Sequence, residues 1–195
     1  MKINAQTALW VWRINESETD LTEQIQLTPD CNSRLKALRS TDHRKAFLAI
    51  RCLLTSLEVP LSDLYYDTHG KPHLKSGTHI SISHAQNYAA VALSKADVGL
   101  DIEQHRSKIK RVVHKFINPN DQLPTEEIPD LITLWCTKEA VYKALSVPGV
   151  SFRSDIVVRI DSDKKWSASY QDQAFDCYAL HWKNYSCVLT QKKPI

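Results

Sequence analysis

The chain has 195 residues, of which 43% are hydrophobic and 24% are charged. This balance is typical of a globular protein with its own core, and it argues against a disordered or membrane-spanning chain. The net charge of +3 is mildly basic, which suits an anionic ligand or an acidic partner. The first apolar run, residues 8–12, is too short for a signal peptide or a membrane span, so we expect a cytoplasmic protein.

The five cysteines form an odd set without a Cys-x-x-Cys pair. Such a set predicts free thiols rather than a disulfide framework or a thiolate zinc site.

The first half of the chain predicts one strand, then helices, then more strands. The strands are short apolar segments bounded by turn residues, at 9–14, 64–66, 79–83 and 88–93. The helices are two short ones at 21–27 and 31–38 and a longer one that begins at Ser40.

The second half predicts the same order of elements. A strand at 98–103 precedes helices at 112–116 and 130–145, and the last strands are 155–160, 166–170, 174–182 and 185–190. We therefore expect an α+β fold of two similar lobes, each with a strand, helices and three strands. The lobes would be residues 1–95 and 96–195, packed as one compact unit.

Two carboxylates lie at alternate positions in the segment Val-Gly-Leu-Asp-Ile-Glu, which begins at Val98. In a strand, Asp101 and Glu103 share one face. Hard oxygen ligands at this spacing suit Mg²⁺, which completes its coordination with water and substrate phosphates. The alternative is the solvated face of an amphipathic strand.

A third carboxylate lies on the predicted helix at 130–145. Trp135, Glu139 and Lys143 are four residues apart and form one stripe, so Glu139 could join Asp101 and Glu103 while Lys143 supplies positive charge for a phosphate. The alternative is an ordinary Glu–Lys pair on the helix surface.

Further polar residues precede these motifs. Ser83 and His84 end a predicted strand, where they could bind a phosphate, and no Gly-x-Ser-x-Gly elbow supports a hydrolase instead. Lys71 follows Gly70 in a tight turn, and Arg44 lies on the preceding helix. The alternative to ligand binding is that both side chains are simply solvated on the surface.

The order and spacing of four segments resemble the 4′-phosphopantetheinyl transferase superfamily, in its larger surfactin-synthetase-activating type. The segments are GKP at Gly70, ISISHA at Ile80, VGLDIE at Val98 and WCTKEAVYK at Trp135. The resemblance implies a monomer of two pseudo-twofold lobes that binds coenzyme A in the cleft between them. It also implies transfer of phosphopantetheine to a serine of an apo acyl or peptidyl carrier protein, with release of adenosine 3′,5′-bisphosphate.

The resemblance further implies roles for individual residues. Asp101, Glu103 and Glu139 would hold Mg²⁺ with the coenzyme A pyrophosphate, and Lys143 would neutralise the pyrophosphate. From the chemistry of the reaction, the candidate general base is Glu139 or a water polarised by the metal. Ser83, His84 and Arg44 would contact the 3′-phosphate, and Lys71 the adenine and the ribose phosphate. Asp121 stands near the position of an acidic residue of the family, in a segment that departs from the family pattern.

The carrier would dock on basic residues beside the site, namely Lys108, Lys110, Arg111 and Lys115.

Two other functions are alternatives to this one. A magnesium-dependent nuclease would need a Glu-x-Lys on the strand, whereas Gln104 and His105 follow Glu103. A binding module without catalysis is the third possibility. Aromatic residues are not interleaved with a basic run, so we expect no nucleic-acid partner, and we expect no membrane either.

Overall fold

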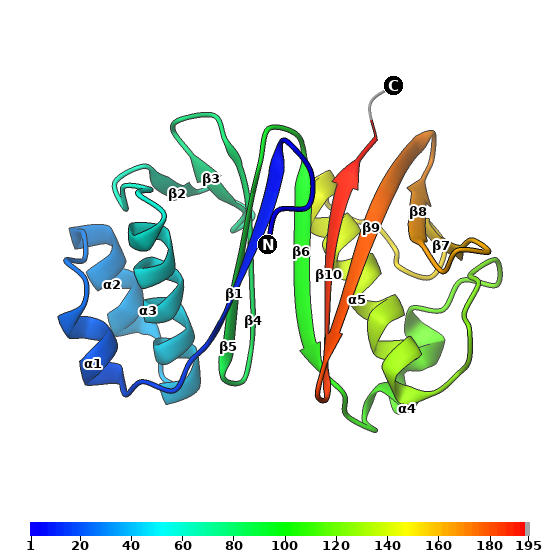
Figure 1. The fold of residues 1–195 in the computed structure, drawn as a ribbon, viewed down its shortest axis with the longest axis horizontal. Coiled ribbons are helices and arrows are strands. Elements are labelled where there is room, and N and C mark those ends of the chain that lie inside the picture. The colour runs from blue at the N-terminus through cyan, green and yellow to red at the C-terminus, as the bar shows by residue number, and fades with distance from the viewer. Residues whose placement is uncertain (194–195) are drawn as a thin grey trace.

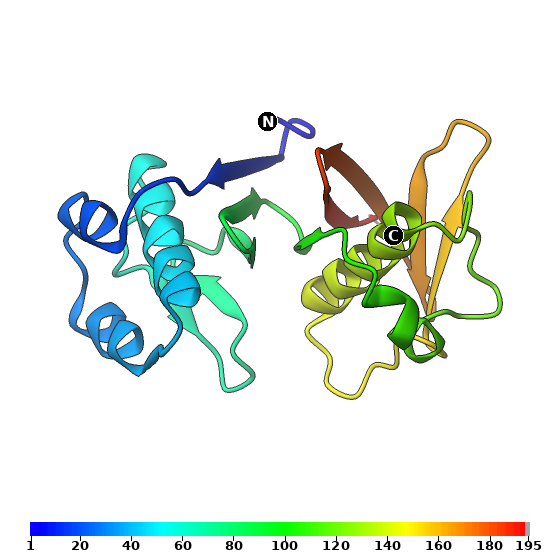
Figure 2. The ribbon, with the colours of Figure 1, turned by 90° about the horizontal axis from the view of Figure 1, so that it is seen from below.

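The computed structural model describes residues 1–193 as a mixed α+β protein whose two halves lie side by side (Figures 1 and 2). The helices are α1 (Glu18–Glu23), α2 (Pro29–Ala37), α3 (Thr41–Ser56), α4 (Ile109–Val112), the 3₁₀ helix η1 (Val113–Lys115) and α5 (Ile128–Leu145). The last two residues of the proposed C-terminal lobe lie outside the described part.

The strands form three antiparallel sheets. Those of the first half are β1 (Thr7–Arg13), β2 (Leu64–Tyr66), β3 (Pro72–Leu74), β4 (His79–Ala85) and β5 (Tyr88–Ser94). Those of the second half are β6 (Val98–Gln104), β7 (Ile156–Ile160), β8 (Trp166–Tyr170), β9 (Gln173–Trp182) and β10 (Tyr185–Lys192). The sheet orders are β1-β5-β4, β2-β3 and β6-β10-β9-β8-β7.

The element order repeats between the halves, but the expected number of strands was wrong. Each half has one strand, then helices, then four strands in the described residues, rather than three. In the second half all four strands correspond to predicted segments, so a strand is missing from the prediction in the first half alone. The missed strand is β3, which has three residues and begins with Pro72, so it offers no alternating pattern. The twofold relation of the halves stays a prediction.

Long helices cover the outer sides of the two main sheets. Apolar residues at helical spacing make α3 amphipathic, and its buried side packs on β5 in a core with Ile80, Ala89 and Val91. In the second half, α5 packs on β6 and β10. Its buried side chains share a core with the strands β7, β8 and β9.

A third apolar cluster lies between the halves. It is formed by the inner sides of both main sheets, with Leu9, Ala90 and Ala92 from the first half and Leu100 and Leu189 from the second among its members. Each of these five residues is at most 1% exposed. The halves are therefore joined by a dry interface, and side chains of the first half lie directly against β6.

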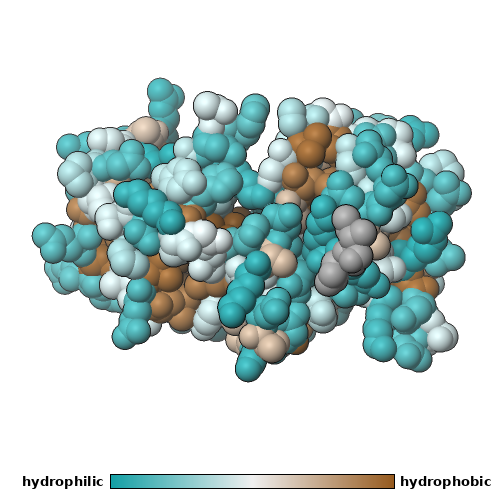
Figure 3. Space-filling model, turned by 90° about the horizontal axis from the view of Figure 1, so that it is seen from above, coloured by the Kyte–Doolittle hydropathy of each residue, from teal (hydrophilic) through white to brown (hydrophobic). Residues whose placement is uncertain are grey.

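The face of the molecule that is seen from above is largely hydrophilic (Figure 3). Seen from above, hydrophobic residues show only in patches between hydrophilic ones (Figure 3). Within residues 1–193, no helix combines the length and the apolar character that crossing a membrane requires.

Candidate active site

Strand β6 presents its polar residues to helix α5. Val98, Leu100 and Ile102 belong to the apolar cluster between the halves, so Gly99, Asp101 and Glu103 face the other way. A Cβ atom added at Gly99 would lie 1.7 Å from the carbonyl oxygen of Ala140. Only glycine lets the helix backbone lie this close to the strand, and this closeness brings the side chains of α5 to the carboxylates.

Asp101 is the centre of the site and is 5% exposed. One of its oxygens, Oδ1, accepts hydrogen bonds from Lys143 Nζ (2.7 Å) and Ser83 Oγ (2.9 Å). The other oxygen, Oδ2, is buried and has no partner among the described residues. A buried carboxylate oxygen without a donor is costly, so Oδ2 is the atom at which a cation would be stabilised.

Lys143 is held by both strand and carboxylate. Besides Asp101, its amine donates to the carbonyl oxygen of Leu100 (2.9 Å). Burial alone would lower the pKa of Lys143, but the contact with Asp101 outweighs it, and the pKa is raised. The side chain therefore stays charged at neutral pH, as a group that neutralises phosphate must.

Glu103 and Glu139 are half-buried near Asp101. Burial, followed by the negative charge of Asp101, raises the pKa of Glu103 to about 7. The same two causes, in the same order, raise the pKa of Glu139. The charge of Asp101 is therefore felt by both Glu103 and Glu139.

The three carboxylates do not form a complete metal cage. Within residues 1–193, no three His, Cys, Asp or Glu side chains gather closely enough to hold a metal ion. Magnesium needs only one or two carboxylates when substrate phosphates supply further oxygens. The free Oδ2 of Asp101 and the neighbouring carboxylates fit that arrangement.

Ser83 and His84 point to opposite sides of β4. Ser83 is buried against β6, whereas His84 lies on the side of α3, where its ring meets the edge of His43 with the centroids 5.5 Å apart. Burial first, and then the charges of His43 and Lys143, lower the pKa of His84. The structure therefore brings Ser83, but not His84, into contact with Asp101.

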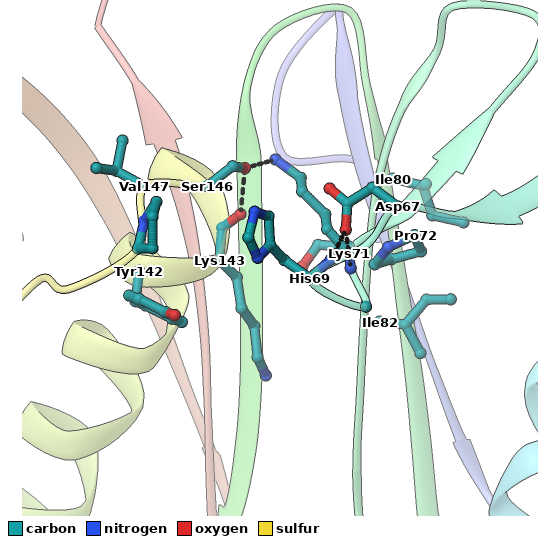
Figure 4. A pocket seen from close by; sticks show the side chains of 13 residues that line it. Asp67, His69, Lys71, Pro72, Ile80, Ile82, Tyr142, Lys143, Ser146 and Val147 are labelled. Atoms are coloured by element: carbon teal, nitrogen blue, oxygen red, sulfur yellow. Dashed lines mark hydrogen bonds between the residues drawn. The ribbon is translucent and has the colours of Figure 1, made fainter.

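Lys71 lies at a cavity between the halves of about 220 Å³. The turn that contains Asp67 and Lys71 forms one wall, and Tyr142 and Val147 at the end of α5 contribute to the other (Figure 4). The amine of Lys71 reaches across and donates to Ser146 Oγ, and burial lowers the pKa of Lys71. Lys143 also borders this cavity, so the cavity adjoins the carboxylates.

Arg44 is not brought to these residues. Its guanidinium pairs with Glu18 on α1 at 2.5 Å and donates to the carbonyl oxygen of Leu35 on α2 at 2.7 Å. It connects three helices of the first half, and its contact with a 3′-phosphate stays a prediction.

The sequence analysis did not predict the role of Ser81 or the pairing of Asp121 with Lys138. Ser81 Oγ accepts a hydrogen bond from the N–H of Leu100. The sequence feature that could have identified Ser81 is its position two residues before Ser83. Lys138 and Asp121 form a buried ion pair at 2.7 Å, with side chains 0% and 2% exposed. Asp121 is therefore a structural residue, and nothing in the spacing of the two residues indicates their pairing.

Comparison with known proteins gives one superfamily and one curated relative. Residues 97–190, which include β6 and α5, match the family model described as the 4′-phosphopantetheinyl transferase superfamily. A curated relative, "4'-phosphopantetheinyl transferase gsp" of Aneurinibacillus migulanus, is 23% identical over 143 residues. That match covers 65% of this chain but only 60% of the relative, so the chain spans less than two thirds of the relative's length.

Proposed function

We propose, from the 4′-phosphopantetheinyl transferase superfamily domain in residues 97–190, that this chain moves phosphopantetheine from coenzyme A to a serine of an apo carrier protein. The second product would be adenosine 3′,5′-bisphosphate. The observation that carries the proposal is Asp101: its Oδ2 is buried without a partner among the described residues, its Oδ1 pairs with Lys143, and Lys143 borders a cavity between the halves.

Magnesium fits the donor set of this cluster. Asp101 with Glu103 or Glu139 would hold it, and oxygens of the coenzyme A pyrophosphate and water would complete its coordination. When bound, the ion would neutralise charge that develops on the transferred phosphoryl group. The partnerless Oδ2 of Asp101 supports this assignment.

The remaining chemistry belongs to the chain's own residues. The hydroxyl oxygen of the carrier serine would form a bond to the β-phosphorus of coenzyme A, and the bond from that phosphorus to the bridging oxygen would break. The bridging oxygen would leave with the adenosine bisphosphate, whose charge Lys143 would offset. Glu139, whose pKa is raised by burial and then by the charge of Asp101, would accept the serine proton.

The cavity beside Lys71 is the proposed site of the nucleotide part of coenzyme A. Lys71 would exchange its contact with Ser146 for a phosphate, and His84 would approach the 3′-phosphate from β4. Apolar side chains of the cavity, such as Ile80 and Val147, suit a planar base.

The whole chain would act as a monomer of two lobes, 1–95 and 96–195, of the larger surfactin-synthetase-activating type. The repeated element order and a cavity with residues from both halves support this reading. An acidic carrier would dock next to the site on exposed basic residues of the segment around α4, namely Lys108, Lys110, Arg111 and Lys115.

Product analysis tests the reaction class. With coenzyme A, Mg²⁺ and an apo acyl carrier protein, adenosine 3′,5′-bisphosphate should appear on chromatography only when the carrier is present. Release without a carrier would indicate a hydrolase instead. Cleavage of plasmid DNA without any nucleotide release from coenzyme A would indicate a nuclease.

A further inference from the structure

Within residues 1–193, strand β6 has a hydrogen-bonded neighbour strand on one edge only. That neighbour is β10, and the other edge of β6 faces β4 of the other sheet. On this edge, the N–H of Leu100 donates to Ser81 Oγ (2.9 Å) and the N–H of Ile102 donates to Ser83 Oγ (3.3 Å). Two serine hydroxyls therefore replace a partner strand and satisfy backbone groups that would otherwise be buried without acceptors.

The hydroxyl of Ser83 has no hydrogen-bonding capacity left. A hydroxyl offers one donor and two acceptor lone pairs. The donor is used by Asp101 Oδ1 at 2.9 Å, and the lone pairs accept from the N–H of Ile102 and, at 3.4 Å, from Lys143 Nζ. Ser83 is also only 7% exposed. A substrate phosphate could bond to Ser83 only by displacing one of these contacts.

Ser83 also decides which oxygen of Asp101 is available. Together with Lys143 it occupies Oδ1, while Oδ2 stays buried and without a partner. The hydrogen bond to Ile102 anchors Ser83 to the backbone residue next to Asp101. The carboxylate is thus held in one rotation by a side chain from the other half of the molecule.

We propose that Ser83 is a positioning residue, which turns Asp101 so that Oδ2 is presented to a divalent cation, and that Ser83 does not contact the substrate. This inference rests on the proposed function, because it assigns the cation site to Asp101. Ser81 would have the edge-satisfying role alone, since its described hydrogen bond is the one from Leu100. Groups that orient a metal ligand contribute about 10–100-fold to metal affinity.

Ser83→Ala and Ser81→Ala are a matched pair for testing this assignment. Each removes one serine acceptor from the same edge of β6, and Ser83→Ala also removes the hydrogen bonds with Asp101 and Lys143, so Ser83→Ala should lower the free energy of unfolding more. Since Ser81 also borders the cavity, the readout is binding of Mn²⁺ alone to the full chain, followed by electron paramagnetic resonance without coenzyme A. Ser83→Ala should bind Mn²⁺ about 10–100-fold more weakly than the wild type, and Ser81→Ala should keep the wild-type affinity.

Further outcomes separate this inference from the proposed function. Equal Mn²⁺ affinity of the two folded variants would overturn the positioning role while the proposed function stands. The positioning role would also be overturned if Ser83→Ala lost coenzyme A binding in the absence of metal, because that loss would indicate that Ser83 contacts coenzyme A directly. A wild type that binds neither Mn²⁺ nor coenzyme A would overturn both. If Ser83→Ala does not fold, Ser83→Thr keeps a hydroxyl and should retain the affinity; a folded Ser83→Thr that has lost it would contradict the role.

Discussion

The charge of Glu103 should change near neutral pH, because burial and then Asp101 raise the pKa of this carboxyl to about 7 from the ordinary 4.5. The folded protein holds this proton more tightly than the unfolded chain. The resulting stability is fully present below pH 4.5 and is lost as pH rises through about 7. Glu103→Gln should remove this pH dependence of the free energy of unfolding.

Urea unfolding in the presence of a chelator measures the effect. The wild type should lose stability relative to Glu103→Gln between pH 5 and 8, and Mg²⁺ should restore part of it at the higher pH, since a cation favours the charged carboxylate. Parallel pH profiles for the two proteins would contradict the assignment. Glu127→Gln, which changes an exposed carboxylate at the start of α5, is the control.

The residues of the site could be predicted where one element fixes their spacing. Alternation in a strand pairs Asp101 with Glu103, and four-residue spacing in a helix pairs Glu139 with Lys143. Contacts between elements could not be predicted in this way. The saturated hydroxyl of Ser83 depends on the register of β4 against β6, and Arg44 pairs with Glu18, 26 residues away. Sequence spacing says nothing of either contact.

At the scale of elements, α5 is fixed near its middle by a buried ion pair. Lys138 donates to Asp121 and to the carbonyl oxygens of Phe152 and Ile156 at 2.8 and 2.9 Å. Asp121 in turn accepts from the N–H of Asn118 and of Val158. The pair therefore connects the helix with the segment after η1 and with β7.

Lys138→Met should destabilise the protein by about 3–5 kcal/mol, because it leaves the Asp121 charge buried and unpaired. Lys165→Met is the matched control, since Lys165 pairs with Asp163 at 3.6 Å on the surface and both side chains are more than 70% exposed. That change should cost at most about 1 kcal/mol. Chemical denaturation compares the two, and equal losses would argue against the importance of the buried pair.

The contact of α5 with β6 depends on Gly99. Gly99→Ala should destabilise the protein by about 1–3 kcal/mol or more and weaken Mn²⁺ binding, because the helix must move away from the strand. Gly77→Ala is the comparison: its Cβ would meet no atom within 4 Å, so only its backbone angle φ of +80° opposes the change. Gly77→Ala should leave Mn²⁺ affinity unchanged. A Gly99→Ala protein with wild-type stability would contradict the close packing.

The long helices were predictable because periodicity extends over several turns. The pattern that begins at Ser40 and the one at 130–145 correspond to Thr41–Ser56 and Ile128–Leu145. Short elements carry too few residues for a pattern, which is why β3 was missed. How the strands divide among three sheets depends on long-range pairing, which no local pattern contains.

At the scale of the whole molecule, the two halves share the apolar cluster around Ala90, Ala92 and Leu100, each 0% exposed. Separating the halves would expose this cluster to water, which is unfavourable in proportion to its apolar area. We therefore expect one cooperative unfolding transition, with tryptophan fluorescence and far-ultraviolet circular dichroism changing together. Two separate transitions would show that the halves are independent domains.

The central claim is that the site formed around Asp101 and Glu139 transfers phosphopantetheine to a serine of a carrier protein. Intact-mass spectrometry of an apo acyl carrier protein, incubated with this protein, coenzyme A and Mg²⁺, tests it most directly. The account predicts a gain of one phosphopantetheine mass, lost with Asp101→Ala and Glu139→Ala and kept with Asp172→Ala, which changes an exposed carboxylate between β8 and β9. No gain on acyl and peptidyl carriers, or an equal gain with Asp101→Ala, would contradict the account.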